Sequence, residues 1–248
     1  MIYVCIPAHN EGRTIGVLLW KIRNTLGEFS RDYRILVHDD ASTDDTQAVL
    51  ERYQRVLPLT LLGSQDQVGY GRSVEKLLRH VVENASYPKR DCAVILQGDF
   101  TENPDDVISL VKMLEGGADI VAGVTDMNGH RMPLGVKIVR SLSRWPLSTV
   151  FRGAPVSDPL NGLRAYRVIV LKKALRDGPG DEPLVSTEGW AANVELLSRL
   201  VPHARRIAEV PAEVRHDLRQ RESRFRPLST LMALMKLRRR DLWPTSNP

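Results

Sequence analysis

Short apolar runs, each followed by a polar turn, repeat along the first half of the chain. Residues 2–6, 34–37 and 93–96 are predominantly apolar and have the length of strands buried on both faces. Apolar side chains then recur at helical spacing after the first two runs, at Ile15, Leu18, Leu19 and Ile22 and at Val49, Leu50 and Tyr53. Strand, turn and helix repeated in this order predict an α/β fold built on a mostly parallel sheet.

All three predicted strands end in polar turns, at residues 7–11, 38–40 and 97–99. Because the carboxyl ends of parallel strands meet at one edge of the sheet, where ligands bind, we expect these turns to form a site. Asp99 ends the third strand, and a carboxylate there can hold a divalent cation against a phosphorylated substrate. Asp99 alone could equally cap the helix that starts near Pro104, but the matching turns of the other strands favour the ligand role.

The order of several motifs resembles the family-two glycosyltransferases with a GT-A fold. The motifs are Ile6-Pro7-Ala8-His9-Asn10-Glu11, Asp39-Asp40-Ala41-Ser42-Thr43-Asp44, Gly69-Tyr70-Gly71 and Gln97-Gly98-Asp99. Residues 156–166 and Glu209-Val210-Pro211 narrow the resemblance to the dolichol-phosphate mannosyltransferase, or polyprenyl-phosphate glycosyltransferase, branch. Each motif is weak alone, but together and in order they cover residues 1–225.

The resemblance implies a Rossmann-like, mostly parallel central sheet flanked by helices. It implies a catalytic domain over residues 1–226, with residues 227–248 as a basic amphipathic segment of the same domain. The implied reaction is an inverting transfer of a sugar from a nucleotide diphosphate, GDP-mannose-like or a UDP-sugar, to a polyprenyl phosphate.

A divalent cation, Mg²⁺ or Mn²⁺, is the cofactor that the resemblance implies, with Asp99 as its first ligand. The family usually has Asp-x-Asp followed two residues later by Gln, whereas this chain has Gln97 in place of the first Asp and Thr101 in place of that Gln. The predicted metal ligands are Asp99, Gln97 and Thr101, of which Gln97 can offer a carbonyl oxygen but no charge. We therefore expect weaker metal binding than in the family, or reliance on the diphosphate, and the departure also admits an inactive relative.

The resemblance places Pro7, His9 and Glu11 around the base and ribose of the donor. Asp39 and Asp40 can accept hydrogen bonds from a base N–H or a ribose hydroxyl, although acidic turns of this kind also occur for purely local reasons. The predicted nucleotide-sugar site is completed by Gln97, Gly98 and Asp99. Gly69-x-Gly71 lacks the third glycine of a dinucleotide fingerprint, so we interpret it as a close backbone turn beneath the donor.

Basic residues are the candidates for binding the acceptor phosphate and the leaving diphosphate. Arg131, Lys137 and Arg140 are predicted to bind the acceptor phosphate, since arginine grips phosphate with two N–H groups. Arg219 and Arg221 lie where the family has an arginine that closes over the diphosphate.

Two acidic residues complete the predictions for the second half of the chain. By resemblance, Asp158 faces the donor and could orient the sugar or accept a proton from an alcohol. With Asp99, Arg219 and Arg221, it forms the predicted catalytic set. Glu188 is expected at the start of the helix that follows it, where the helix dipole favours a carboxylate.

Composition fits one α/β domain in a reducing compartment. The chain has 248 residues, 42% of them hydrophobic, and its two cysteines, Cys5 and Cys92, fall in or beside predicted core strands. We expect two buried small hydrophobic residues there, not a disulfide. No signal peptide and no apolar stretch of roughly 20 residues is evident. The expected location is cytoplasmic, with a peripheral position on the cytoplasmic membrane face as an option.

Positive charge is concentrated near the C-terminus. Residues 215–240 hold nine Lys or Arg against Asp217 and Glu222, so this segment carries +7 and the rest of the chain −2. Such a segment suits an anionic membrane surface, a diphosphate or nucleic acid. Nucleic acid is disfavoured because no recognised motif and no interleaved aromatic residues accompany the charge.

Residues 228–237 carry leucines and methionines mostly on one side of a predicted helix, followed by Arg238, Arg239, Arg240 and Trp243. Binding to a membrane interface and packing onto the domain or a partner subunit explain this face equally well. The three arginines favour the membrane.

Two other functions stay open on the sequence alone. One is sugar transfer to a hydroxyl of a soluble metabolite or natural product. The other is a non-catalytic nucleotide-sugar-binding or nucleic-acid-binding protein. The sequence does not determine the oligomeric state.

Overall fold

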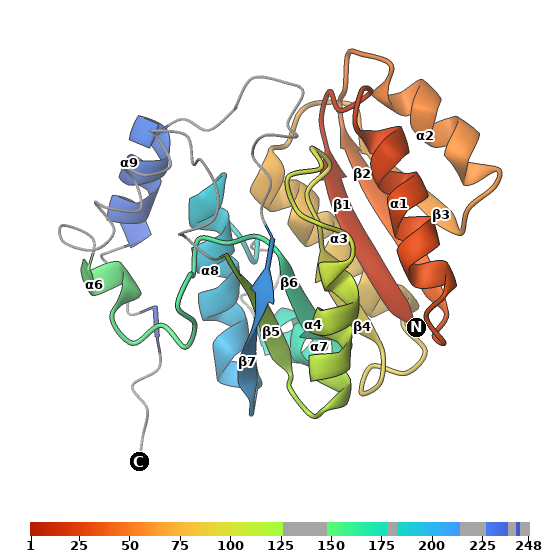
Figure 1. Ribbon diagram of the computed structural model, residues 1–248. Coiled ribbons are helices and arrows are strands. Elements are labelled where there is room, and N and C mark those ends of the chain that lie inside the picture. The colour runs from red at the N-terminus through yellow and green to blue at the C-terminus, as the bar shows by residue number, and fades with distance from the viewer. Residues whose placement is uncertain (126–147, 178–182, 214–226, 238–241, 244–248) are drawn as a thin grey trace.

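The computed structural model describes residues 1–125, 148–177, 183–213, 227–237 and 242–243, and within these ranges the chain builds one seven-stranded sheet in the order β3-β2-β1-β4-β6-β5-β7 (Figure 1). The strands are β1 (Ile2–Ala8), β2 (Tyr33–Asp40), β3 (Leu59–Ser64), β4 (Cys92–Ile95), β5 (Ile120–Thr125), β6 (Arg164–Arg167) and β7 (Ile207–Ala212). Only β6 runs antiparallel to its neighbours. The predicted α/β fold with a mostly parallel sheet is confirmed.

Helices cover both faces of this sheet. They are α1 (Ile15–Gly27), α2 (Thr46–Gln54), α3 (Tyr70–Asn84), α4 (Asp106–Glu115), the short α6 (Ser148–Phe151), α7 (Val168–Asp177), α8 (Trp190–Leu200), a 3₁₀ turn (Val201–His203) and α9 (Pro227–Leu237). In Figure 1, α1 and α4 lie in front of the sheet, while α3, α7 and α8 lie behind it. The first two strands begin where the apolar pattern predicts and extend two or more residues into the polar turns.

The core has one layer on each face of the sheet, because alternate residues of a strand point to opposite sides. On β1, Val4 packs in the layer under α1 and α4, and Cys5 packs in the layer under α3, and both are completely buried. Cys92 belongs to the first layer and Cys5 to the second, and neither forms a disulfide. The prediction of two buried free cysteines is confirmed.

The C-terminal helix α9 packs against α8. Leu234 and Leu237 are buried against Val194 and its neighbours, whereas Met232 and Met235 are exposed. Further along, the Trp243 indole N–H donates a hydrogen bond of 2.7 Å to the carbonyl of Val150. Part of the apolar face of α9 is therefore used inside the domain. The domain boundary at residue 226 lies outside the described residues and stays a prediction.

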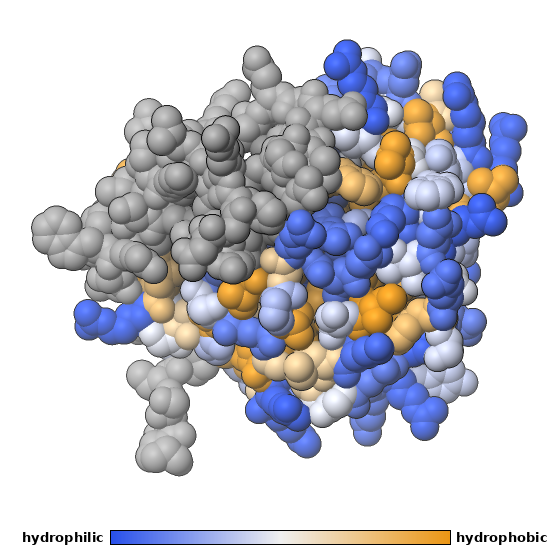
Figure 2. All heavy atoms as spheres, viewed as in Figure 1, coloured by the Kyte–Doolittle hydropathy of each residue, from blue (hydrophilic) through white to orange (hydrophobic). Residues whose placement is uncertain are grey.

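No helix within the described part of the chain is both long and apolar enough to cross a bilayer. On the face shown in Figure 2, hydrophobic residues of the described surface are scattered among hydrophilic ones and form no continuous apolar area.

A chain of hydrogen bonds links α3 through the end of β3 to His38, near the end of β2. Lys76 Nζ donates to Ser64 Oγ at 2.6 Å, and Ser64 Oγ lies 3.1 Å from Nε2 of the buried His38. Because an ammonium group only donates, the serine hydroxyl is left to donate to the imidazole. Burial lowers the pKa of His38, and the charge of Lys76 adds to this effect.

The lowered pKa of His38 predicts a loss of stability in mild acid. As pH falls through 6.5, the ordinary pKa of the imidazole, the unfolded chain takes up a proton that the folded chain does not. The free energy of unfolding should therefore decrease between pH 7 and pH 5.5. Urea unfolding of wild type and His38→Gln at both pH values measures this, and the variant should lose less stability. Equal losses would contradict the prediction.

Candidate active site

The loops after β1 and β2 are joined by hydrogen bonds. Asn10 N donates to Ser42 Oγ at 2.8 Å, and Thr43 N donates in return to Asn10 Oδ1 at 2.7 Å. The His9 ring nitrogen Nδ1 lies 2.7 Å from the carbonyl oxygen of Asp40. The two polar turns that the sequence predicts at one edge of the sheet therefore form one continuous surface.

The neighbouring carboxylates Asp39 and Asp40 have different partners. Both oxygens of Asp40 accept backbone N–H groups, from Val68 at 2.6 Å and Gly69 at 2.8 Å. Oδ1 of Asp39 accepts the N–H and hydroxyl of Ser42, and no hydrogen bond from the described residues reaches its Oδ2. Asp40 therefore stabilises the turn before α3, and its predicted role in binding the donor stays a prediction. Asp39 is the better candidate for binding a donor, and this role stays a prediction.

The loop after β4 is closed on itself by two buried carboxylates. Oδ1 of Asp99 accepts the Thr101 hydroxyl at 2.6 Å and the Thr101 N–H at 3.2 Å. Glu102 accepts the N–H of Gln97 at 2.8 Å. Asp99 and Glu102 are only 1% and 2% exposed. This geometry fixes Asp99 at the end of the strand independently of any ligand.

Glu102 is a residue of this loop that sequence reasoning missed. Burial raises its pKa to about 8, and the nearby carboxylate of Asp99 adds to the shift. The sequence shows only an acidic residue in an acidic turn, where exposure is the usual expectation. Nothing in the pattern distinguishes a buried carboxylate that closes the loop from a solvated one.

The predicted metal ligands Asp99, Gln97 and Thr101 offer only oxygen atoms, the ligands that Mg²⁺ and Mn²⁺ prefer. Among the described residues, no group of three His, Cys, Asp or Glu side chains is placed to hold a metal ion. The three predicted metal ligands include one carboxylate, that of Asp99. The hydroxyl of Thr101 donates a hydrogen bond to this carboxylate. These residues fit a cation that also binds the diphosphate of a ligand, and their role as metal ligands stays a prediction.

The loop after β4 also contacts the loop after β1. The Thr14 hydroxyl donates to the Gly98 carbonyl at 3.0 Å. A Cβ on Gly98 would lie 3.3 Å from the carbonyl oxygen of Pro7 and 3.4 Å from Cγ of Glu11. Gly98 is therefore needed for close packing, and it brings the predicted donor-binding residues Pro7 and Glu11 next to the loop that carries Asp99.

Backbone strain occurs in all three of these loops. Asn10, Ala41 and Phe100 have positive φ angles of 50°, 54° and 61°, one in each loop. Side chains other than glycine rarely adopt this conformation, and when they do, the residues gather at functional sites. The strained residues therefore support a functional site at the edge of the sheet where the loops after β1, β2 and β4 meet.

The turn that contains Asp158 joins the same region. Oδ1 of the half-buried Asp158 accepts the Leu160 N–H at 3.2 Å. A Cβ on Gly162 would lie 3.1 Å from the hydroxyl of Tyr70 and 3.4 Å from Nε2 of Gln97. The turn is therefore adjacent to both the glycine turn and the loop after β4. An action of Asp158 on a substrate stays a prediction.

Arg164 holds this turn in place and was also missed from the sequence. It is 1% exposed and donates to the carbonyls of Asn193 at 2.6 Å and Pro159 at 2.5 Å. Charged residues are rarely buried, so a single arginine in a polar strand gives no signal of this role.

Five of the predicted site residues lie outside the described part of the chain. They are Arg131, Lys137, Arg140, Arg219 and Arg221. Their predicted contacts with the acceptor phosphate and the diphosphate stay predictions.

The family model described as "Glycosyl transferase family 2" matches residues 3–175, well over half of the sequence. The chain therefore belongs to glycosyl transferase family 2, as the motifs indicated.

Comparison with curated proteins shows which members of the family this chain resembles. The chain is 25% identical over 178 residues to an undecaprenyl-phosphate 4-deoxy-4-formamido-L-arabinose transferase of Pseudomonas fluorescens, covering 69% of this chain and 48% of the relative. It is 26% identical over 215 residues to an uncharacterized protein of Methanocaldococcus jannaschii, covering 85% and 79%. The resemblance to the polyprenyl-phosphate branch is thus confirmed at low identity. The chain spans about half the length of the transferase that it matches.

Solved structures confirm the GT-A fold. A glucosyl-3-phosphoglycerate synthase from Mycobacterium tuberculosis, in complex with Mn²⁺, UDP and glucosyl-3-phosphoglycerate, has a TM-score of 0.64 at 22% identity, covering 99% of this chain and 81% of that one. TarS of S. aureus has a TM-score of 0.57 at 17% identity, with 95% and 64% covered. At these identities the likeness establishes the fold alone.

Proposed function

We propose that the protein is an inverting, metal-assisted glycosyltransferase that moves a sugar from a nucleotide diphosphate to a polyprenyl phosphate. The observation that carries the proposal is the convergence of the loops after β1, β2 and β4, where Gly98, the neighbour of the buried Asp99, packs against the loop of Glu11. Family membership supports the reaction type. The name of the Pseudomonas relative supports a lipid phosphate as acceptor.

The donor would lie along this edge of the sheet. Pro7, His9, Glu11, Asp39 and Asp40 would hold the base and ribose. Asp99 with Gln97 and Thr101 would hold the cation. A bound divalent cation would neutralise charge that develops on the departing diphosphate. Arg219 and Arg221 would add positive charge to the same group.

The proposed acceptor, a lipid phosphate, has to be positioned for attack but does not have to lose a proton. A phosphate oxygen is already anionic at neutral pH, so attack on the anomeric carbon needs alignment and screening of charge. Arg131, Lys137 and Arg140 are the residues proposed for this task. Asp158 would orient the sugar.

The second candidate is transfer to a hydroxyl of a soluble acceptor. One observation favours it: α9, the helix predicted for the membrane, buries Leu234 and Leu237 against α8. In that case Asp158 would accept the proton of the alcohol. Assays with a short polyprenyl phosphate and with soluble alcohols, each in the presence of anionic vesicles and without them, separate the two acceptors and test the peripheral membrane location.

Donor binding can be tested before any acceptor is known. A ligand that binds only the folded state stabilises it, by about 2.7 kcal/mol at a concentration one hundred times its Kd. Thermal unfolding with UDP-sugars and GDP-sugars, with and without Mn²⁺, should show stabilisation that requires the metal. Stabilisation without transfer to any acceptor would support a binding protein. No stabilisation by any nucleotide sugar would contradict the proposal.

A further inference from the structure

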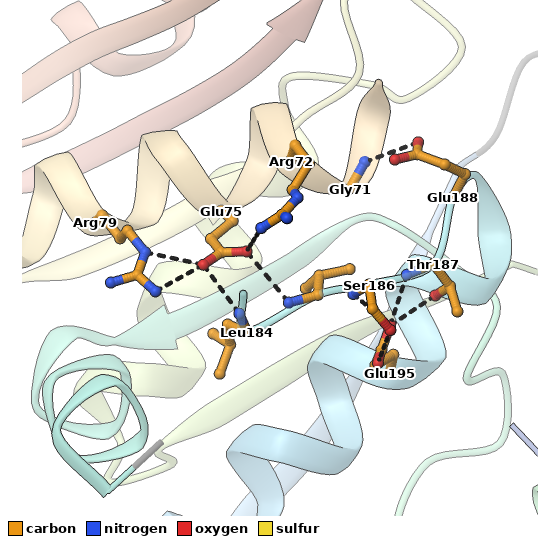
Figure 3. A network of polar contacts seen from close by, with 10 residues as sticks. Gly71, Arg72, Glu75, Arg79, Leu184, Ser186, Thr187, Glu188 and Glu195 are labelled. Carbon is orange, nitrogen blue, oxygen red and sulfur yellow. Dashed lines mark hydrogen bonds and ion pairs between the residues drawn. The ribbon is translucent and has the colours of Figure 1, made fainter. Parts of the chain in front are cut away.

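Residues 184–188, here called the latch, form an extended segment between α3 and α8 (Figure 3). The latch pairs with no strand among the described residues, and four of its backbone N–H groups donate to carboxylates instead. Glu75 of α3 accepts Leu184 N at 2.9 Å and Val185 N at 3.2 Å. The same carboxylate forms an ion pair with Arg79 at 2.8 Å. One side of the latch is therefore fixed to α3.

The next two residues of the latch are fixed to α8. Glu195, which is 1% exposed, accepts the backbone N–H groups of Ser186 and Thr187, both at 2.8 Å. It also accepts their hydroxyls, at 2.7 and 2.9 Å. Carboxylates from two helices that lie far apart in the sequence thus accept four consecutive amides of the latch, so these contacts do not depend on a ligand.

Glu188, at the end of the latch, reaches the N-terminus of α3. Its Oε2 accepts the N–H of Gly71 at 3.2 Å, and Figure 3 shows its carboxylate directed at Gly71. Sequence reasoning expected Glu188 to pair with the start of its own helix, α8. The structure adds a contact that this expectation did not include, because the carboxylate accepts the N–H of Gly71 in α3, while its pairing with the dipole of α8 stays a prediction.

The two glycines of the turn explain how the latch approaches so closely. A Cβ on Gly69 would lie 2.6 Å from the carboxylate of Glu188, and a Cβ on Gly71 would overlap the carbonyl oxygen of Thr187. Gly69 also has a φ of +89°. The Gly-x-Gly pattern, predicted to lie beneath a donor, therefore makes room for the chain's own latch.

Asp40 and Glu188 together occupy the amides at the start of α3. Asp40 accepts the N–H groups of Val68 and Gly69, and Glu188 accepts that of Gly71. A helix N-terminus attracts anions through its first amides, and here carboxylates of the chain accept three of the N–H groups in and just before the first turn of α3.

Tyr70, between the two glycines, extends from this turn across the site. Its hydroxyl donates to Asn193 Oδ1 at 2.9 Å, and it lies beside Gly162 and Gln97. The position of the turn therefore determines how the first half of the site meets the Asp158 turn. We propose that Glu188, held by the latch, is a positioning residue that fixes the Gly69–Gly71 turn and so aligns the donor-binding loops. The functional part of this inference rests on the function proposed above.

Amide exchange tests the positioning directly in the protein without ligand. First-turn amides have no acceptor within their own helix, so protection of the Gly71 amide reports its bond to Glu188. In Glu188→Ala we expect this amide to exchange about tenfold faster, since that is roughly what one hydrogen bond to a charged group contributes. Glu51→Gln is the control, because Glu51 is an exposed carboxylate on α2. This variant should leave the exchange rate of the Gly71 amide unchanged. Unchanged exchange of Gly71 in Glu188→Ala would overturn the proposal.

Kinetics separate positioning from direct contact with substrate. Glu188→Ala should raise the donor KM several-fold and lower kcat less, in parallel with the faster exchange at Gly71. A higher KM with normal Gly71 exchange would mean that Glu188 touches the substrate, and would also overturn the proposal. If the wild-type protein binds no nucleotide sugar, the proposed function fails, and the exchange experiment still decides whether Glu188 fixes the turn.

Discussion

Replacing Asp99 with asparagine is expected to lower the turnover of a nucleotide sugar by about two to three powers of ten, the usual cost of removing a group that stabilises developing charge. Asp99 supplies the single carboxylate of the predicted metal set, so the variant removes the negative charge that attracts the cation. The fold should survive, because an asparagine oxygen can still accept the Thr101 N–H and hydroxyl. Turnover at saturating Mn²⁺, together with direct measurement of metal affinity, provides the test.

Asp32→Asn is the matched control for that experiment. Asp32 is exposed and directly precedes β2, at the opposite edge of the sheet from the loops of the site. Its replacement should leave turnover and metal affinity unchanged. Near-normal, metal-stimulated turnover in Asp99→Asn would remove Asp99 from the proposed mechanism.

Shortening Leu234 to alanine should destabilise the protein by about 2–5 kcal/mol, the usual cost of emptying a buried leucine site. Leu234 is completely buried where α9 packs on α8. Met232 lies on the same helix and is 56% exposed, so Met232→Ala should change the free energy of unfolding by no more than about 0.5 kcal/mol. Urea unfolding of both variants gives the comparison.

The outcome also bears on the predicted membrane role of α9. If Leu234→Ala is as stable as wild type, α9 does not depend on α8 in solution, and its apolar face is available to a bilayer. If the loss of stability is found, removal of the segment after Pro227 would damage the domain itself. Such a truncation could then not be used to test membrane binding.

The positions of three of the seven described strands and of the predicted site edge could be inferred from sequence because both depend on local patterns. Apolar runs at residues 2–6 and 93–96 mark central strands, Asp39 is the last residue but one of β2, and Asp99 follows the end of β4. The short strand β6 was not predicted. Its four residues include two arginines, and no apolar run distinguishes it from a loop.

Contacts between distant parts of the chain could not be inferred in this way. Gly71 and Glu188 are 117 residues apart, and Tyr70 and Asn193 are 123 apart, so no local spacing links them. Glu102 and the two terminal nitrogens of Arg164 are buried in hydrogen bonds to backbone groups, and a single sequence carries no pattern for such contacts. The packing of α9 was one of two alternatives that its amphipathic pattern allowed.

Release of nucleoside diphosphate is the most direct test of the proposed activity. The folded protein would be incubated with UDP-sugars and GDP-sugars and Mn²⁺, with and without a short polyprenyl phosphate, and the nucleoside diphosphate released would be measured. We predict release from one donor class that increases strongly when the lipid phosphate is added and disappears when the metal is chelated. Absence of release from every donor, with lipid phosphate and with soluble alcohols alike, would contradict the assignment as a glycosyltransferase.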